Sequence, residues 1–205
     1  LTSIMHYTPK NHGLEVLANL ETSLWERLPK GSFLLGLSGI TWREAWKYGE
    51  RSFRYTNLDA GHAWQSIVVS AQMLGWKTTR LDSISDTDID TLFGLQQKNR
   101  FFEKEHADML FVISPESIDP SLTLEDLLEN TPLQFDGIAN QLSPSMQKWD
   151  IIGEVEDATS TAQLAQKPAQ VKSIAREPSQ ESKVVVLQRR SVHIMQKETS
   201  LLTKE

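Results

Sequence analysis

The chain lacks cysteine altogether. Disulfide bonds, thiolate nucleophiles, iron–sulfur clusters and thiolate zinc sites are therefore excluded. The five histidines show no spacing typical of metal ligands. We therefore expect no metal site.

Long apolar runs and long basic runs are also missing. Because no stretch reads as a signal peptide or as a bilayer span, we expect a cytoplasmic protein that does not enter a membrane. The net charge is -6, and basic residues cluster in nothing longer than a pair, which argues against nucleic-acid binding. With 205 residues, 39% of them hydrophobic, the chain can bury one core of ordinary size and carry an appendage.

The first 115 residues predict an α+β fold with a mixed, largely antiparallel sheet packed by helices. A hairpin is expected where residues 1–7 and 13–20 flank a turn, and further strands at residues 32–37, 77–81 and 108–113. Short helices are expected at residues 21–28 and 85–92. Ser85 and Asp88 have capping-box spacing, and Gly94 can end the second of these helices.

The stretch from residue 40 to residue 76 concentrates aromatic, basic and helix-forming residues. Its second half, residues 57–76, predicts a helix buried on most sides because apolar residues recur every three or four positions. Asn57 or Asp59 can cap its start and Gly75 can end it. The six tryptophans are interpreted as packing anchors.

Composition changes after residue 115. Residues 116–157 predict a helical and irregular connector that forms an extended C-terminal arm. Residues 158–182 have the Ala, Gln, Ser and Pro content of a flexible linker. Residues 183–205 differ again and predict the start of another unit. Since the chain begins at Leu1 inside a strand pattern and ends in a helix-like pattern, we expect a fragment of a longer protein.

The central stretch also resembles the SagB-type dehydrogenases, flavin-dependent members of the nitroreductase superfamily that includes thiazole and oxazole oxidases. The resemblance rests on an ordered series of residues: Trp46, Lys47, Tyr48, Gly49, Glu50, Arg51, Phe53, Arg54, Tyr55, Asp59, Gly61, His62, Ala63, Ala71, Leu74, Gly75 and Trp76.

This resemblance implies a nitroreductase-like fold and FMN as the cofactor. Relatives dimerise or fuse two copies with the flavin at the interface, so a homodimer or an intrachain pair of such domains is expected. Residues 1–115 would then be the C-terminal part of one domain and residues 183–205 the start of the next. Arg189 and Ser191 resemble a phosphate-contacting motif, although a solvated basic turn is the more common explanation of so short a motif.

Lys47 and Tyr48 match the pair that lies over the flavin in azoline-oxidising relatives, and they are the predicted catalytic residues. A lysine can act there as base or cation and a tyrosine as donor, if their surroundings shift the pKa values toward neutrality. Gly49 permits the bend that would let both side chains reach one ligand. The alternative is a surface lysine beside a half-buried tyrosine.

The predicted cofactor-binding residues of the central stretch are Arg51, Arg54, Gly61 and His62. Arg51 and Arg54 can hold an anion, with Arg54 expected to be the more buried of the two, and Gly61 permits close approach of a ligand. The alternatives are that Glu44 and Glu50 pair with the arginines, and that Asp59 pairs with His62.

Three functions follow from these residues. The first is an FMN-dependent oxidoreductase acting on a peptide or small molecule, with azoline-to-azole oxidation as the reaction; the fragment alone is expected to be inactive. The second is a non-catalytic interaction module, favoured because no Arg or Lys follows the strand at residues 108–113. The third is a nitro or quinone reductase, which shares the fold and the cofactor.

Overall fold

The computed structural model describes residues 2–128, 133–142, 144–160 and 180–191. The strands are β1 (Thr2–Thr8), β2 (Gly13–Leu20), β3 (Phe33–Gly39), β4 (Lys77–Arg80) and β5 (His106–Ser114). The helices are α1 (Leu24–Arg27), α2 (Trp42–Tyr48), α3 (Ser52–Met73), α4 (Asp86–Phe93), α5 (Leu124–Leu128), α6 (Asp150–Thr159) and α7 (Gln180–Gln188). Within those described ranges, no helix is both long enough and apolar enough to cross a membrane.

The chain opens with the predicted β-hairpin. Strands β1 and β2 pair antiparallel from Thr2 opposite Leu20 to Thr8 opposite Gly13. His12 in the connecting turn has a φ of 51°, in the left-handed region. The register shifts between Ile4 and Met5, which marks an irregularity in the ladder.

A second sheet has β5 at its centre, with β3 and β4 each paired antiparallel to it. Side chains of β5 alternate between the two faces, as the period of a strand requires. Phe111 and Ile113 pack on one face with Ala71 of α3, whereas Leu110 and Val112 belong to the cluster on the other face. Both faces are covered, and this explains why β5 reads as an almost continuous apolar run.

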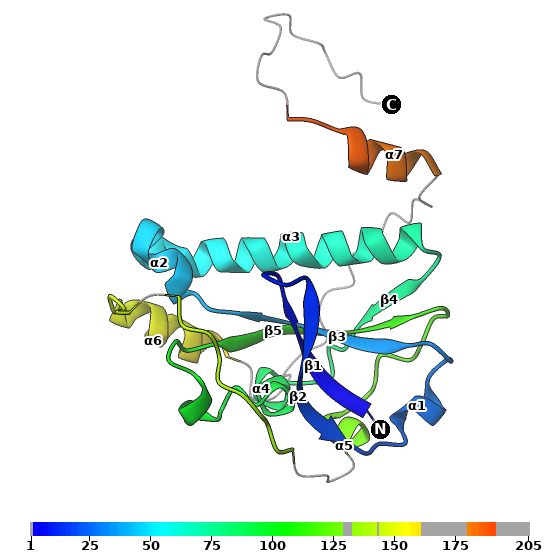
Figure 1. Ribbon diagram of the computed structural model, residues 1–205, viewed down its shortest axis with the longest axis horizontal. Coiled ribbons are helices and arrows are strands. Elements are labelled where there is room, and N and C mark those ends of the chain that lie inside the picture. The colour runs from blue at the N-terminus through cyan, green and yellow to red at the C-terminus, as the bar shows by residue number, and fades with distance from the viewer. Residues whose placement is uncertain (1, 129–132, 143, 161–179, 192–205) are drawn as a thin grey trace, which may run out of the picture.

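Helices cover the two faces of this sheet unequally. Helix α3 spans one face, while α1, α4 and α5 lie on the opposite side (Figure 1). The larger core cluster includes Leu24 of α1, Ile89 and Leu92 of α4, and Leu127 of α5. The predicted α+β class, with antiparallel strands packed by helices, is confirmed.

Helix α4 begins and ends where local signals predict. The Ser85 hydroxyl accepts a hydrogen bond from the Asp88 N–H at 3.2 Å, and the Asp88 carboxylate accepts one from the Ser85 N–H at 3.3 Å. Gly94 closes the helix in the left-handed region, with a φ of 71°. The predicted capping box is confirmed because all of its partners lie within four residues.

Helix α3 differs from its prediction at its start and in its burial. It begins at Ser52, so Asn57 and Asp59 lie inside the helix and cap nothing. The Asn57 amide instead donates to the Phe53 carbonyl at 2.8 Å, a bond within the helix. Gly75, with a φ of 77°, follows the helix end as predicted. The expectation of a helix buried on most sides is wrong, because only Ser52 and Ala71 are fully buried.

The segment from residue 133 to residue 160 forms an arm that packs across the fold. The Asp136 N–H donates to the Leu17 carbonyl at 2.7 Å, and the Arg100 guanidinium donates to the carbonyls of Asp136 and Gly137. The arm ends in α6, which lies below α2 in Figure 1. The expected connector at residues 116–157 therefore includes a segment fixed to the core.

Two expectations fall partly outside the described residues. Helix α6 runs to Thr159 and α7 begins at Gln180, both inside the predicted linker of residues 158–182, and the linker between them is not described. The same applies to most of residues 183–205, of which α7 and the three residues after it are described. Helix α7 lies beside α3 (Figure 1).

Candidate functional site

The junction between α2 and α3 brings the predicted catalytic pair to one turn of the chain. Helix α2 ends at Tyr48, and Gly49 follows with a φ of 57° and a ψ of -137°, a conformation that favours glycine. The Gly49 N–H donates to the Ala45 carbonyl and closes the helix. A single 3-10 turn, Gly49–Arg51, then leads directly into α3. The bend that Gly49 was expected to permit is therefore present.

At this junction Lys47, Tyr48 and Tyr55 lie together. The Lys47 ammonium is 4.9 Å from the centroid of the Tyr48 ring, within reach of a cation–π interaction. The Tyr48 ring is in turn 4.4 Å from the Tyr55 ring, centroid to centroid. Tyr55 comes from the first turn of α3, so the two helices share one aromatic contact.

This arrangement favours the charged form of Lys47. Hydrogen bonding to Tyr48, followed by the electrostatic effect of that residue, raises the pKa of Lys47 above its ordinary value of 10.5. Lys47 is exposed, so burial does little to lower its pKa. The direction is opposite to the one a lysine base needs near neutral pH. Lys47 is therefore an ammonium at neutral pH and suits a role as cation and donor.

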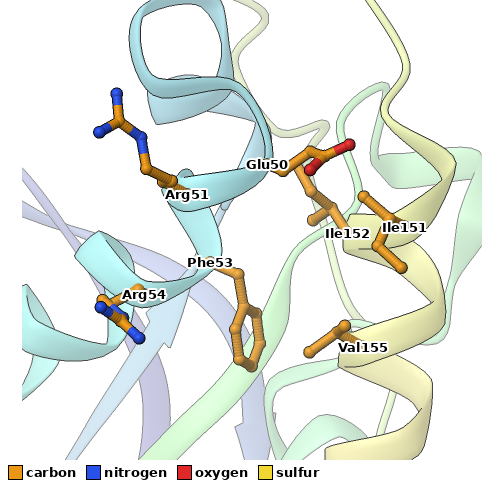
Figure 2. Close-up of a pocket in the computed structure, with 7 residues that line it drawn as sticks. All are labelled: Glu50, Arg51, Phe53, Arg54, Ile151, Ile152 and Val155. Carbon is orange, nitrogen blue, oxygen red and sulfur yellow. The ribbon is translucent and has the colours of Figure 1, made fainter.

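Beside the junction, α3 and α6 enclose a half-open groove of about 330 Å³. Its lining is mainly apolar, from Phe53 of α3 and from Ile151, Ile152 and Val155 of α6. In Figure 2 the Phe53 ring points between the two helices toward Val155, and Glu50 lies across from Ile151. The α6 residues that line the groove follow Phe53 by about a hundred residues in the chain.

Arg51 and Arg54 line the other side of this groove. Figure 2 shows both guanidinium groups directed away from α6, toward the outer side of α3. Both residues are exposed, and the expectation that Arg54 is the more buried of the two stays a prediction. Among the ion pairs of the described residues, none joins either arginine to Glu44 or Glu50. Two positive charges near the start of α3 therefore remain accessible to an anion.

Gly61 and His62 lie further along the same helix. A Cβ placed on Gly61 would meet nothing within 4 Å, so the backbone there is open to a ligand or a partner. The His62 side chain is 82% exposed, and its Nδ1 lies 3.8 Å from Asp59, too far for a hydrogen bond. Neither residue lines the groove, and neither does Tyr48. The predicted cofactor-binding residues of the central stretch thus lie in α3 or just before it, and only Arg51 and Arg54 line this groove.

Arg189 and Ser191 follow α7 and are exposed. The basic side chain of the neighbouring Arg190 donates to the carbonyls of Gln188 and Arg189 at 3.1 and 2.9 Å. These contacts are those of a basic turn. A phosphate-binding role for Arg189 and Ser191 stays a prediction.

One cation of the central stretch has a structural role that the sequence did not reveal. The Arg43 guanidinium of α2 donates to the buried Glu103 carboxylate at 2.6 Å, and also to the Asn140 carbonyl at 3.0 Å. Arg43 therefore ties α2 to the segment before β5 and to the arm. Its partner lies sixty residues away, beyond the reach of a spacing argument.

A second group of charged residues gathers where β5 begins. His106 lies 3.8 Å from Asp108 and 3.6 Å from Glu156 of α6, measured between nitrogen and oxygen atoms. Burial raises the pKa of Asp108 to about 6; the charge of His106 partly opposes this, and the nearby carboxylates of Asp86, Glu105 and Glu156 add to it. His106 and Glu156 thus connect β5 to α6, and keeping Asp108 charged beside these carboxylates costs free energy.

Asp108→Asn is expected to stabilise the protein at about pH 7.5 by about 1–3 kcal/mol. Because the folded-state pKa of Asp108 lies above its ordinary value of 3.8, the folded protein binds this proton more tightly than the unfolded chain. The Asp108 carboxyl therefore makes its full contribution to the free energy of unfolding below about pH 4, and this contribution is lost as the pH rises through about 6. Urea unfolding of both proteins at about pH 5 and 7.5 measures the difference, with the exposed Asp157→Asn as control. A loss of stability at the higher pH would contradict the assignment.

Sequence comparison agrees with the resemblance at the level of the family. Residues 6–102 match the model of the Nitroreductase family, a family of oxidoreductases. The match runs from the hairpin through the α2–α3 junction to the turn before β5. Over this range, close to half of the chain, similarity to the nitroreductases is thus confirmed. Comparisons with curated proteins and with solved structures gave no match.

Several residues at the site escaped the sequence analysis. Tyr55 was seen only as part of a motif, although its aromatic neighbour Tyr48 seven residues earlier could have suggested a contact across a tight turn. Phe53 was likewise seen only as part of the motif. The α6 residues Ile151, Ile152 and Val155 gave no signal, because their proximity to Phe53 depends on the path of the arm. Trp46 was expected to be a packing anchor and is 73% exposed instead.

Proposed function

We propose that the protein is an FMN-dependent oxidoreductase of the SagB type, acting on a peptide or small molecule and oxidising azolines to azoles. The observation that carries the proposal is the Lys47–Tyr48 pair at a glycine turn, inside the segment that matches the nitroreductases. When bound, FMN supplies the hydride acceptor. The remaining chemistry falls to side chains of the protein.

The residues present fit an anionic flavin on two counts. Arg51 and Arg54 offer two exposed guanidinium groups near the start of a 22-residue helix, where positive potential is also expected. Gly61 leaves the helix backbone open for close approach. His62 is exposed and free to donate to a carbonyl. These four residues would hold the cofactor.

Lys47 and Tyr48 would act on the substrate. Since the raised pKa keeps Lys47 positively charged at neutral pH, its ammonium would bind a substrate oxygen or nitrogen and stabilise negative charge that develops there. The Tyr48 hydroxyl would donate to the same region. The pair thus orients the substrate and stabilises charge. Lys47 does not serve as the base, and the proton that the azoline loses together with the hydride would pass to solvent, to which Lys47 is exposed.

A second nitroreductase-like unit would complete the site, from another copy of the chain or from a neighbouring domain that includes Arg189 and Ser191. Exposed apolar side chains support this proposal. Leu58 of α3, Leu74 directly after α3 and Trp46 of α2 are large apolar side chains left exposed. A second unit that packs on α2 and α3 would cover them.

The experiment uses the full-length protein. FMN is expected to bind it, and Lys47→Ala is expected to lower turnover about a hundredfold while FMN stays bound, since the loss of one preorganised charge has effects of that size. Tyr48→Phe should lower turnover less. Unchanged rates in both variants would remove the pair from the mechanism. Activity on nitro compounds or quinones, with none on azolines, would favour the reductase alternative.

A non-catalytic interaction module is the second candidate. It is favoured by the sequence after β5, where residues 115–122 contain no Arg or Lys to hold a phosphate. FMN binding separates the two candidates, because a module of this kind takes up no flavin.

A further inference from the structure

The arm reaches the α2–α3 junction along a path fixed by hydrogen bonds. Before the junction, the Ala139 N–H donates to the Arg100 carbonyl at 2.8 Å, and the Asn140 carbonyl accepts from Arg43. After it, Lys104 pairs with Asp157 of α6 at 3.0 Å. The arm is therefore anchored on both sides of the residue that lies at the junction, Trp149.

Trp149 packs directly on the turn that follows the Lys47–Tyr48 pair. A Cβ built on Gly49 would lie 3.3 Å from Cζ2 and 3.4 Å from Cη2 of the indole. The ring thus occupies the space that a side chain at position 49 would need. The backbone carbonyl of Trp149 accepts a hydrogen bond from the Ile152 N–H at 2.9 Å, so Trp149 is joined to the first turn of α6.

The conformation of Gly49 sets how α3 follows α2, and with it how Tyr55 lies against Tyr48. Its positive φ breaks the chain between α2 and the 3-10 turn, and the Tyr48 ring before this break contacts the Tyr55 ring after it. A glycine turn without a covering side chain samples more conformations than one packed under a ring. The contact with Trp149 removes that freedom at the residue next to Tyr48.

We infer that Trp149 is a positioning residue, which holds the Gly49 turn and thereby fixes Lys47 and Tyr48 against Tyr55. The arm lies about a hundred residues after Lys47 and Tyr48 in the chain, and on this inference it helps to position them. The expected effect on turnover depends on the proposed oxidoreductase function, whereas the effect on the Lys47–Tyr48 contact does not.

The first test measures that contact without flavin or substrate. Lysine titration by NMR on the full-length protein compares wild type, Trp149→Leu and Trp149→Phe. In the leucine variant the pKa of Lys47 is expected to fall toward its ordinary value, because the interaction with Tyr48 that raises it is loosened. The phenylalanine variant, which keeps an aromatic ring over Gly49, is expected to retain the wild-type value.

A tryptophan remote from the junction provides the matched control. Trp25 is partly buried, packs on the larger core cluster and donates to the Thr2 hydroxyl at 2.6 Å. Trp25→Leu is expected to destabilise the fold without changing the titration of Lys47. An unchanged Lys47 pKa in Trp149→Leu, or an equal shift in Trp25→Leu, would overturn the inference.

The second test follows turnover of the flavin-loaded protein. Trp149→Leu is expected to lower kcat about tenfold to a hundredfold with KM within about twofold, because small misplacements of catalytic groups act on the chemical step. Trp149→Phe should restore most of the rate. A rate lost only through a raised KM would contradict a positioning role. Absence of flavin from the wild-type protein would refute the proposed function and leave the titration as the test of Trp149.

Discussion

Arg43→Met is expected to lower the free energy of unfolding by about 3–5 kcal/mol, the range found when one partner of a buried ion pair is removed. The side chain of Glu103 is 3% exposed and that of Arg43 is 28% exposed, so the pair is largely shielded from water. Glu103 Oε1 is already buried without a hydrogen-bond partner among the described residues. Removing Arg43 would leave the whole carboxylate uncompensated.

Two further variants separate this explanation from a general effect of losing an arginine. The double variant Arg43→Met with Glu103→Leu is expected to recover most of the loss, since no buried charge remains. Arg27→Met removes an exposed ion pair with Asp126 and is expected to change stability by at most about 1 kcal/mol. Chemical unfolding measures the free energy of unfolding of all three variants. Equal losses for Arg43→Met and Arg27→Met would contradict the buried-pair account.

Gly94→Ala is expected to destabilise the protein by about 2–4 kcal/mol through two effects. Its φ of 71° is unfavourable for alanine, and the new Cβ would lie 2.6 Å from Cδ2 of Phe135. The Phe135 ring, which also stacks 4.9 Å from the Arg100 guanidinium, would have to leave its place at the start of the arm. The mutation therefore tests how firmly the arm is attached to α4.

Gly75→Ala is the matched control, because Gly75 also follows a helix with a φ of 77° but has nothing within 4 Å of a built Cβ. Gly75→Ala should lower the free energy of unfolding only through the unfavourable backbone conformation of alanine at this φ, by about 1–2 kcal/mol. In a Phe135→Ala background the extra loss from Gly94→Ala is expected to disappear. Similar losses at the two glycines in the wild-type background would show that Phe135 does not hold the arm as described.

The features that the sequence predicted correctly depend on neighbours a few residues apart. The hairpin, the capping box of Ser85 and Asp88, and the left-handed glycines after α3 and α4 each follow from local backbone chemistry. Strand β5 was also predictable, because burial on both faces leaves a continuous apolar run from Met109 to Ile113.

The features that were missed depend on contacts between distant parts of the chain. The start of α3 was placed at Asn57 because that residue type favours helix caps. The helix begins at Ser52 instead, and its first turn contacts distant residues, Tyr55 against Tyr48 and Phe53 in the groove beside α6. The ion-pair partner of Arg43 and the α6 wall of the groove arise from the path of the arm. No periodicity or motif in the sequence describes that path.

The burial of α3 was overestimated for a related reason. Apolar spacing identifies residues such as Trp64, Ile67 and Ala71 that pack on the sheet. It does not distinguish a face packed within the chain from one that another unit covers. Leu74 follows the same spacing and is 76% exposed.

FMN titration of the purified full-length protein tests the central claim most directly. Binding of one FMN per site is expected, and it should weaken at least about a hundredfold when Arg51 and Arg54 are both replaced by alanine, since hydrogen bonds to charged groups contribute about 1.5–3 kcal/mol each. Arg27→Ala, far from α3, should bind FMN as the wild type does. A colourless protein that takes up no FMN would contradict the oxidoreductase assignment and favour the interaction module.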